Sequence, residues 1–159
     1  MTPEEITLAQ NTEKTRKLVD RQIVTFKMGL DPNPKPSSWL TIRSVKTSPE
    51  NNAEYEKALE TLKPVLAESA KGGHLTGWSF WAHTFFNAAS PWDYSSVSEY
   101  ATLDDALKFT KTGLNTASEF KKVYPTQDYK AYSKRLLELR HLVSLELWQR
   151  VIGTEAAPK

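Results

Sequence analysis

At 159 residues the chain has the length of one domain and is large enough to bury a core. Its formal net charge of +2 is spread without a long basic run, which argues against binding to nucleic acid. The absence of cysteine excludes disulfides, thiolate catalysis and thiolate metal sites, and it leaves the compartment open. No apolar run approaches the roughly 20 residues needed to cross a membrane, and the start MTPEEITLAQ lacks the apolar centre of a signal peptide. We therefore expect a soluble protein without a membrane partner, either cytoplasmic or exported with its signal already removed.

The first 30 residues predict a helix. Thr2, Pro3 and Glu5 supply a hydroxyl cap, a proline in the first turn and a carboxylate near the positive end. Apolar residues then recur at helical spacing, namely Ile6, Leu18, Val19, Ile23, Phe26 and Leu30. We predict helix to about Met28. Residues 31–38, DPNPKPSS, carry prolines at alternate positions, which forbid a helix and favour an extended connector.

Residues 39–114 predict a strand, a helix, two strands and a helix in that order. The stretch WLTIRSVK, 39–46, alternates its side chains and is rich in β-branched residues, which is typical of a strand. A helix over 49–71 follows and ends at a glycine pair. Pro64 lies inside it and predicts a kink or a short break, because an interior proline removes a backbone hydrogen bond.

Two aromatic runs, LTGWSFWAHTFF and DYSSVSEYA, come next and predict a hairpin with a longer loop. In the first run Trp78 and Phe80 share one face, while Trp81, His83 and Phe85 share the other. Both faces carry large apolar groups, which is typical of a strand covered on both sides. We expect Trp78 and Phe80 to pack against helices and the other face to line whatever the sheet encloses.

The rest of the chain predicts helices. Thr102 and Asp105 form a capping-box-like start, and a short helix is expected over 115–124. Residues 127–152 give the longest helical signal, with apolar side chains around much of the circumference. Such a helix would be buried against more than one surface, and one of these could belong to a second subunit. We expect 115–159 to form a C-terminal helical segment.

The order of elements over 39–114 matches the core of a split βαβ, ferredoxin-like unit. On the stretches LKPVLAESAKGGHLTGWSFW and DYSSVSEYATLDDAL, the chain resembles the dimeric α+β-barrel superfamily, which includes antibiotic-biosynthesis monooxygenase-like proteins. It is most similar to uncharacterised, often exported bacterial members, in which an Arg-containing helix ends near Trp, as Arg140 and Trp148 do here. The resemblance implies an α+β fold with an antiparallel sheet, additional N- and C-terminal helices, and a homodimer formed through the sheet faces or the last helix.

The chain departs from the superfamily pattern in two places. No clear fourth strand follows the helix that begins near Leu103, and its place could be taken by the segment after Trp148, by the N-terminal region, or by nothing. Haem-degrading members need an Asn on the first strand, and WLTIRSVK contains none. We therefore expect no haem.

His83 and Arg43 are the candidate catalytic residues. His83 lies mid-strand among aromatic residues, where burial would favour its neutral form, a base or a ligand. Arg43 would bind a carboxylate or an enolate oxygen if it faced the same cavity. The alternatives are a hydrogen-bonded core histidine and an exposed or ion-paired arginine. Four aromatic residues could line a pocket for a small apolar or aromatic ligand, although core packing explains them equally well: Trp81, Phe85, Tyr94 and Tyr100.

No cofactor is expected. Glu138 and His141 have the spacing of half a di-iron motif, but the second half is missing, so no metal site is predicted. The leading function hypothesis is a small-molecule-binding barrel that performs cofactor-independent oxygenation or isomerisation of an aromatic or enolisable substrate, with His83 as base and Arg43 as oxyanion partner. The competing hypothesis is a non-enzymatic binding or structural module in which the same aromatic residues are only core.

Overall fold

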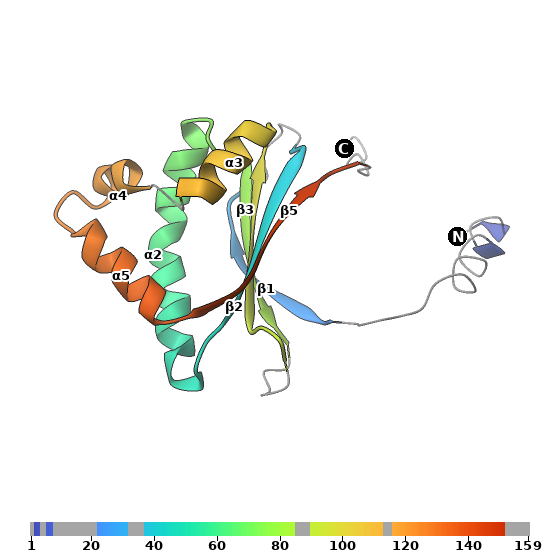
Figure 1. The fold of residues 1–159 in the computed structure, drawn as a ribbon, viewed down its shortest axis with the longest axis horizontal. Helices are drawn as coiled ribbons and strands as arrows, with labels where there is room; N and C mark the ends of the chain where they lie inside the picture. The colour runs from blue at the N-terminus through green and yellow to red at the C-terminus, as the bar shows by residue number, and fades with distance from the viewer. Residues whose placement is uncertain are drawn as a thin grey trace.

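The computed structural model describes residues 2–3, 6–7, 22–31, 37–84, 90–112 and 116–151. Its centre is a five-stranded antiparallel sheet in the order β1-β3-β4-β2-β5. The strands are β1 (Val24–Gly29), β2 (Trp39–Lys46), β3 (Gly77–His83), β4 (Tyr94–Tyr100) and β5 (His141–Gln149). The helices are η1 (Pro49–Asn51), α2 (Asn52–Lys71), α3 (Leu103–Thr112), α4 (Ala117–Val123) and α5 (Tyr129–Glu138). Figure 1 shows the labelled helices on one side of the sheet, so the chain has the predicted α+β fold.

The core of this arrangement is ferredoxin-like. Elements β2, α2, β3, β4, α3 and β5 follow the β-α-β-β-α-β order. The first and last strands of this unit, β2 and β5, are neighbours, and β4 lies between β2 and β3. The additions are β1, which extends the sheet beyond β3, and the helices α4 and α5, which lie between α3 and β5 in the chain. The strand at 39–46 and the aromatic hairpin are thus confirmed.

The N-terminal helix predicted to about Met28 is wrong at its end. Val24–Gly29 form β1, which pairs antiparallel with β3. Backbone hydrogen bonds to β3 and the edge-on contact of Phe26 with Trp81, at 5.2 Å between ring centroids, favour a strand over the local helical spacing. The backbone is helical at Pro3, Ile6 and Thr7, which fits the predicted helix start. The middle of that helix and most of the proline connector lie outside the described residues.

The C-terminal helix predicted over 127–152 is wrong in its second half. Helix α5 ends at Glu138, and His141 begins β5, which pairs with β2 along its length. In a stretch so rich in leucine, helical and strand spacings are both met, and the hydrogen bonds offered by the edge of β2 decide between them. Strand β5 therefore fills the fourth position of the ferredoxin-like unit. Glu138 and His141 do not lie on one helix, so the half-motif for metal is not formed.

Helix α2 runs unbroken through Pro64, so the predicted short break does not occur. Pro64 is exposed, whereas Leu62, Val65 and Leu66 are buried on the opposite side of the helix. Burial of that apolar stripe outweighs the loss of one backbone hydrogen bond. The predicted start of α3 is confirmed, because the hydroxyl of Thr102 accepts from the backbone N–H of Asp105 at 3.2 Å.

Stacked aromatic rings form the core between the sheet and α2. Phe80 and Tyr94 stack at 5.2 Å, and Trp78 stacks on Phe80 at 6.3 Å. Tyr55 of α2 packs on Tyr94 at 5.3 Å from the helix side. Trp78 and Phe80 are 5% and 0% exposed, so their predicted packing against helices is confirmed.

The added helices are fixed to α2 through a second aromatic group. Phe120 of α4 is fully buried and stacks on Tyr132 of α5 at 4.9 Å. The Tyr132 hydroxyl donates to the carbonyl oxygen of Ala58 at 2.8 Å, and the Tyr124 hydroxyl donates to that of Thr61 at 3.2 Å. Both carbonyls belong to α2, so α2 carries the sheet on one side and the added helices on another.

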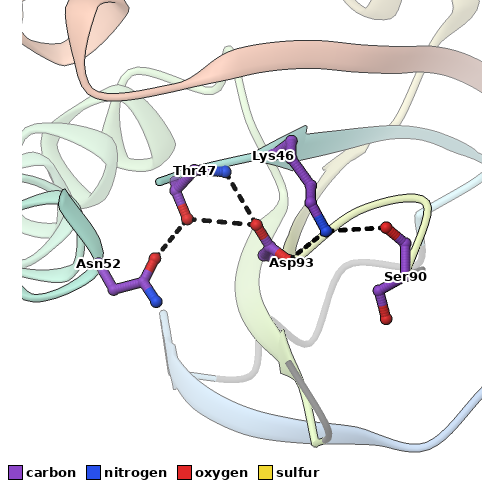
Figure 2. Close-up of polar contacts among 5 residues, drawn as sticks. All are labelled: Lys46, Thr47, Asn52, Ser90 and Asp93. Carbon is purple, nitrogen blue, oxygen red and sulfur yellow. Dashed lines mark hydrogen bonds and ion pairs between the residues drawn. The ribbon is translucent and has the colours of Figure 1, made fainter. Parts of the chain in front are cut away.

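A polar cluster at one end of the sheet is built around the buried carboxylate of Asp93 (Figure 2). One of its oxygens accepts from the backbone N–H of Thr47 at 2.9 Å, and the other accepts from Lys46 Nζ at 2.9 Å. Lys46 Nζ also donates to the carbonyl oxygen of Ser90 at 2.8 Å, and the Thr47 hydroxyl donates to Asn52. Asp93 therefore ties the end of β2 and the start of α2 to the segment before β4.

Replacing Asp93 with alanine is expected to lower the free energy of unfolding by about 2–3 kcal/mol, because it leaves the Thr47 N–H and the half-buried Lys46 without their carboxylate. Denaturant titration followed by circular dichroism measures this. Asp104 is exposed in the first turn of α3, so the control Asp104→Ala should cost only about 0.5 kcal/mol. Equal losses in the two variants would contradict the role of the cluster.

Candidate functional site

The face of the sheet away from the helices carries apolar side chains from every strand, mixed with serines and two glutamates. Residues paired directly across antiparallel strands lie on the same face, which assigns the side chains. The pairs on this face include Phe26 with Trp81, Ile42 with Val97, and Leu40 with Trp148. Phe26 and Trp148 are each 54% exposed. We call this surface the open face, and no helix in the described ranges covers it (Figure 1).

Trp81 and His83 lie on the open face. They alternate along β3 with the buried residues Phe80 and Ala82. The indole N–H of Trp81 donates to the hydroxyl of Ser79 at 2.9 Å, which fixes the ring over the sheet. The His83 ring lies edge-on to Trp92 at 5.3 Å, near the end of the strand. Phe85, predicted to share this face, lies outside the described residues.

Arg43 lies on the opposite face of the sheet from His83. Its neighbour across the strand pair is Ser96, and it lines a cavity with Tyr55 of α2 on the helix side. The structure therefore does not bring His83 and Arg43 together, and the predicted pair of base and oxyanion partner is not formed within one chain. The reason is that side chains alternate between the two faces along each strand, and the register of strand pairing decides which face each residue of β2 and β3 takes.

The predicted aromatic wall is divided between the two faces. Tyr94 and Tyr100 are 1% and 0% exposed and belong to the core under the helices. The Tyr94 hydroxyl donates to Glu56 at 3.0 Å, and the Tyr100 hydroxyl lies 3.4 Å from that of Thr41. Of the four predicted wall residues, only Trp81 is seen on the open face. The two tyrosines follow the core-packing alternative.

A small cavity lies between the sheet, α2 and α5, with a volume of about 20 Å³. Arg43 and Arg140 both line it, together with Tyr55, Ser96 and Ser98. The Nε of Arg140 is buried and has no hydrogen-bond partner. The sequence pointed to Arg140 only as part of a family resemblance, because nothing local indicates that a residue just before a strand will meet Arg43.

Two further features bear on the class of protein. Among the described residues, no three side chains of His, Asp or Glu gather as metal ligands would. Within the same part of the chain, no helix combines the length and apolar character required to cross a membrane.

Comparison with known proteins gives a distant structural likeness. No protein-family model matches the chain, and a search of curated proteins returns no match. One matching solved structure is that of an anthrone oxidase-like protein, with a TM-score of 0.43 and 14% sequence identity. The match covers 77% of this chain and 50% of that chain, so this chain spans half the length of its neighbour. We therefore infer function from the residues of this chain.

The buried tyrosines predict a loss of stability at alkaline pH. Burial raises the pKa of Tyr100 to about 12, and it also raises the pKa of Tyr55, Tyr94 and Tyr132. Because an unfolded tyrosine ionises near pH 10, this stabilisation is complete below about pH 10 and is lost as the pH rises through about 12. Denaturant titrations across this window should show a falling free energy of unfolding. A Tyr100→Phe variant should show a shallower fall, and an identical fall would contradict the assignment.

Proposed function

We propose that the protein is a homodimeric binding module whose open face packs against the open face of a second copy, with a small apolar or aromatic molecule held between the two sheets. The observation that carries this proposal is the series of apolar side chains on the open face, which runs from β1 at one edge to β5 at the other. A covered sheet face is typical of aromatic strands of this kind, and here the described helices cover only the other face.

The shape of the open face favours a second sheet as its cover. Its exposed aromatic residues, Phe26 and Trp148, lie on the edge strands β1 and β5, with Trp81, Val97 and Ile42 between them. Such a broad surface fits another sheet at a spacing of about 10 Å better than it fits one helix. A second copy offers the same surface, and a two-fold axis makes the contact self-complementary.

Three carboxylates on the open face accept hydrogen bonds from neighbouring residues, and one of them is also paired with a lysine. Glu99 accepts from the hydroxyl of Ser37 at 2.6 Å, and Glu146 accepts from the indole N–H of Trp148 at 2.9 Å. Asp93 and Lys46 are paired with each other. Hydroxyl and indole donors hold the other two carboxylates without cancelling their charge, so a dimer through this face must leave Glu99 and Glu146 in contact with water or a cation.

The proposed ligand lies near Trp81 and His83. Trp81 offers an oriented aromatic ring, Phe26 forms a T-shaped contact with it, and His83 supplies a polar group at the end of the strand. Aromatic walls with a few polar groups are the usual composition of a small-molecule site. The ferredoxin-like order of elements supports a place for the chain in the dimeric α+β-barrel superfamily.

We propose binding without catalysis. The expected oxygenation or isomerisation of an aromatic or enolisable substrate needs a base and a group that stabilises the developing negative charge. His83 lies on the open face, but Arg43 lies under the helices on the other side of the sheet. A catalytic role for His83 would require an oxyanion partner from the second copy or from the ligand.

The dimer is tested by replacing Phe26 and Trp148 together with serine. These side chains are each 54% exposed in one chain, so the double variant should fold and yet lose the interface. Light scattering should give twice the chain mass for the unaltered protein at micromolar concentration and the single mass for the variant. Leu137 is 61% exposed on α5 in the helix layer, so the control Leu137→Ser should remain dimeric. A monomeric unaltered protein would refute the proposal.

The ligand is tested separately by native mass spectrometry of the purified dimer. We expect a non-covalent mass in excess of two chains, and we expect its loss in Trp81→Ala, because that change removes the central aromatic wall. The control Val97→Ala removes a smaller, non-aromatic side chain from the same face, so this variant should keep the added mass. A dimer that carries no added mass, even after incubation with an aromatic probe such as indole, would contradict ligand binding while leaving the dimer intact.

A further inference from the structure

We propose that Arg43 and Arg140 form a binding site for a small carboxylate between the sheet and α2. This site lies on the helix side and is separate from the open face. It does not depend on the dimer or on the ligand proposed above.

The two arginines are brought to one cavity by the tertiary structure. Arg43 projects from β2, and Arg140 lies between the end of α5 and the start of β5. Because His141, the first residue of β5, pairs with Lys46 of β2, the preceding residue Arg140 is held close to β2. Ser96, the neighbour of Arg43 on β4, and Tyr55 of α2 complete the polar part of the cavity lining.

Within the described ranges, neither arginine forms an ion pair with a carboxylate. The acidic side chains of α2 nearest Tyr55 in sequence are bound elsewhere. Glu54 holds Arg135 with a nitrogen-to-oxygen distance of 2.6 Å, and Glu56 holds Lys27 at 3.0 Å. The cavity thus contains two positive charges without a negative one.

The tyrosine in the cavity does not supply the missing charge. Burial raises the pKa of Tyr55, against the opposing effect of both arginines, so its hydroxyl stays neutral. Burial and the nearby charge of Arg140 lower the pKa of Arg43, which nevertheless remains protonated because arginine pKa values are so high. Two half-buried like charges are unfavourable without a counter-ion, and the unpartnered Nε of Arg140 offers a donor to one.

A carboxylate fits these donors and this volume. Its planar pair of oxygens matches the fork of a guanidinium group and accepts from two donors at once. A cavity of about 20 Å³ has room for roughly one or two water-sized groups. The apolar part of the wall, which includes Leu59 and Leu136, suits a methyl group beside the carboxylate. Formate and acetate are the smallest carboxylates and so the closest to this volume, whereas an aromatic carboxylate is far too large.

Isothermal titration calorimetry of the full chain with sodium acetate, at constant ionic strength, tests the site. We expect saturable binding that weakens by about tenfold or more in Arg43→Met and in Arg140→Met, since each loses a charge-assisted donor pair. Arg140→Lys keeps the charge but not the fork, so it should also bind acetate more weakly. Arg150 is exposed beyond the end of β5, and the control Arg150→Met should bind acetate as the unaltered protein does.

Thermal unfolding gives a second measurement that does not require every variant to be equally stable. Acetate should raise the melting temperature of the unaltered protein above its value in chloride at the same ionic strength, and this rise should vanish in Arg140→Met. Equal melting temperatures in acetate and chloride would overturn the proposal. So would an undiminished acetate response in both arginine variants, or binding of benzoate as tight as that of acetate.

Discussion

The stack of Phe80 and Tyr94 beneath Tyr55 of α2 is the contact on which the arrangement of this protein depends. It fixes which face of the sheet the helices cover. Because side chains alternate along a strand, burying Phe80 turns Trp81 and His83 to the open face. Phe80 is paired across the strands with Ser96, and Ser96 with Arg43, so all three side chains lie on the same face, under the helices.

The two faces consequently have different chemistry. The helix side encloses a cavity with two arginines that have no carboxylate partner in the described part of the chain, which is suited to an anion. The open face is broad and carries apolar side chains from every strand among serines and glutamates, with the exposed aromatic residues Phe26 and Trp148 on its edge strands, which is suited to a second sheet and an apolar ligand. This division separates the two residues expected to act together, His83 and Arg43, and it explains why we propose two binding sites instead of one catalytic centre.

The edge strands were the least predictable part of the fold. Both β1 and β5 come from stretches whose apolar spacing also fits a helix, and each becomes a strand by pairing with a partner distant in the sequence. Propensity and periodicity describe a segment in isolation, whereas the edge of a sheet offers backbone hydrogen bonds that only the folded protein provides. The Asp93 cluster was missed for the same reason, since its partners come from separate elements.

The sequence by itself determined the α+β class, the strand at 39–46, helix α2, the aromatic hairpin and the burial of Trp78 and Phe80. These features follow from local periodicity, caps and turns, which a short stretch encodes. Only the tertiary structure decided that residues 24–29 and 141–149 are strands, that Arg43 and His83 lie on opposite faces, and that Arg140 meets Arg43. Those outcomes depend on strand register and on which face the helices cover, and both are set by contacts between residues far apart in the chain.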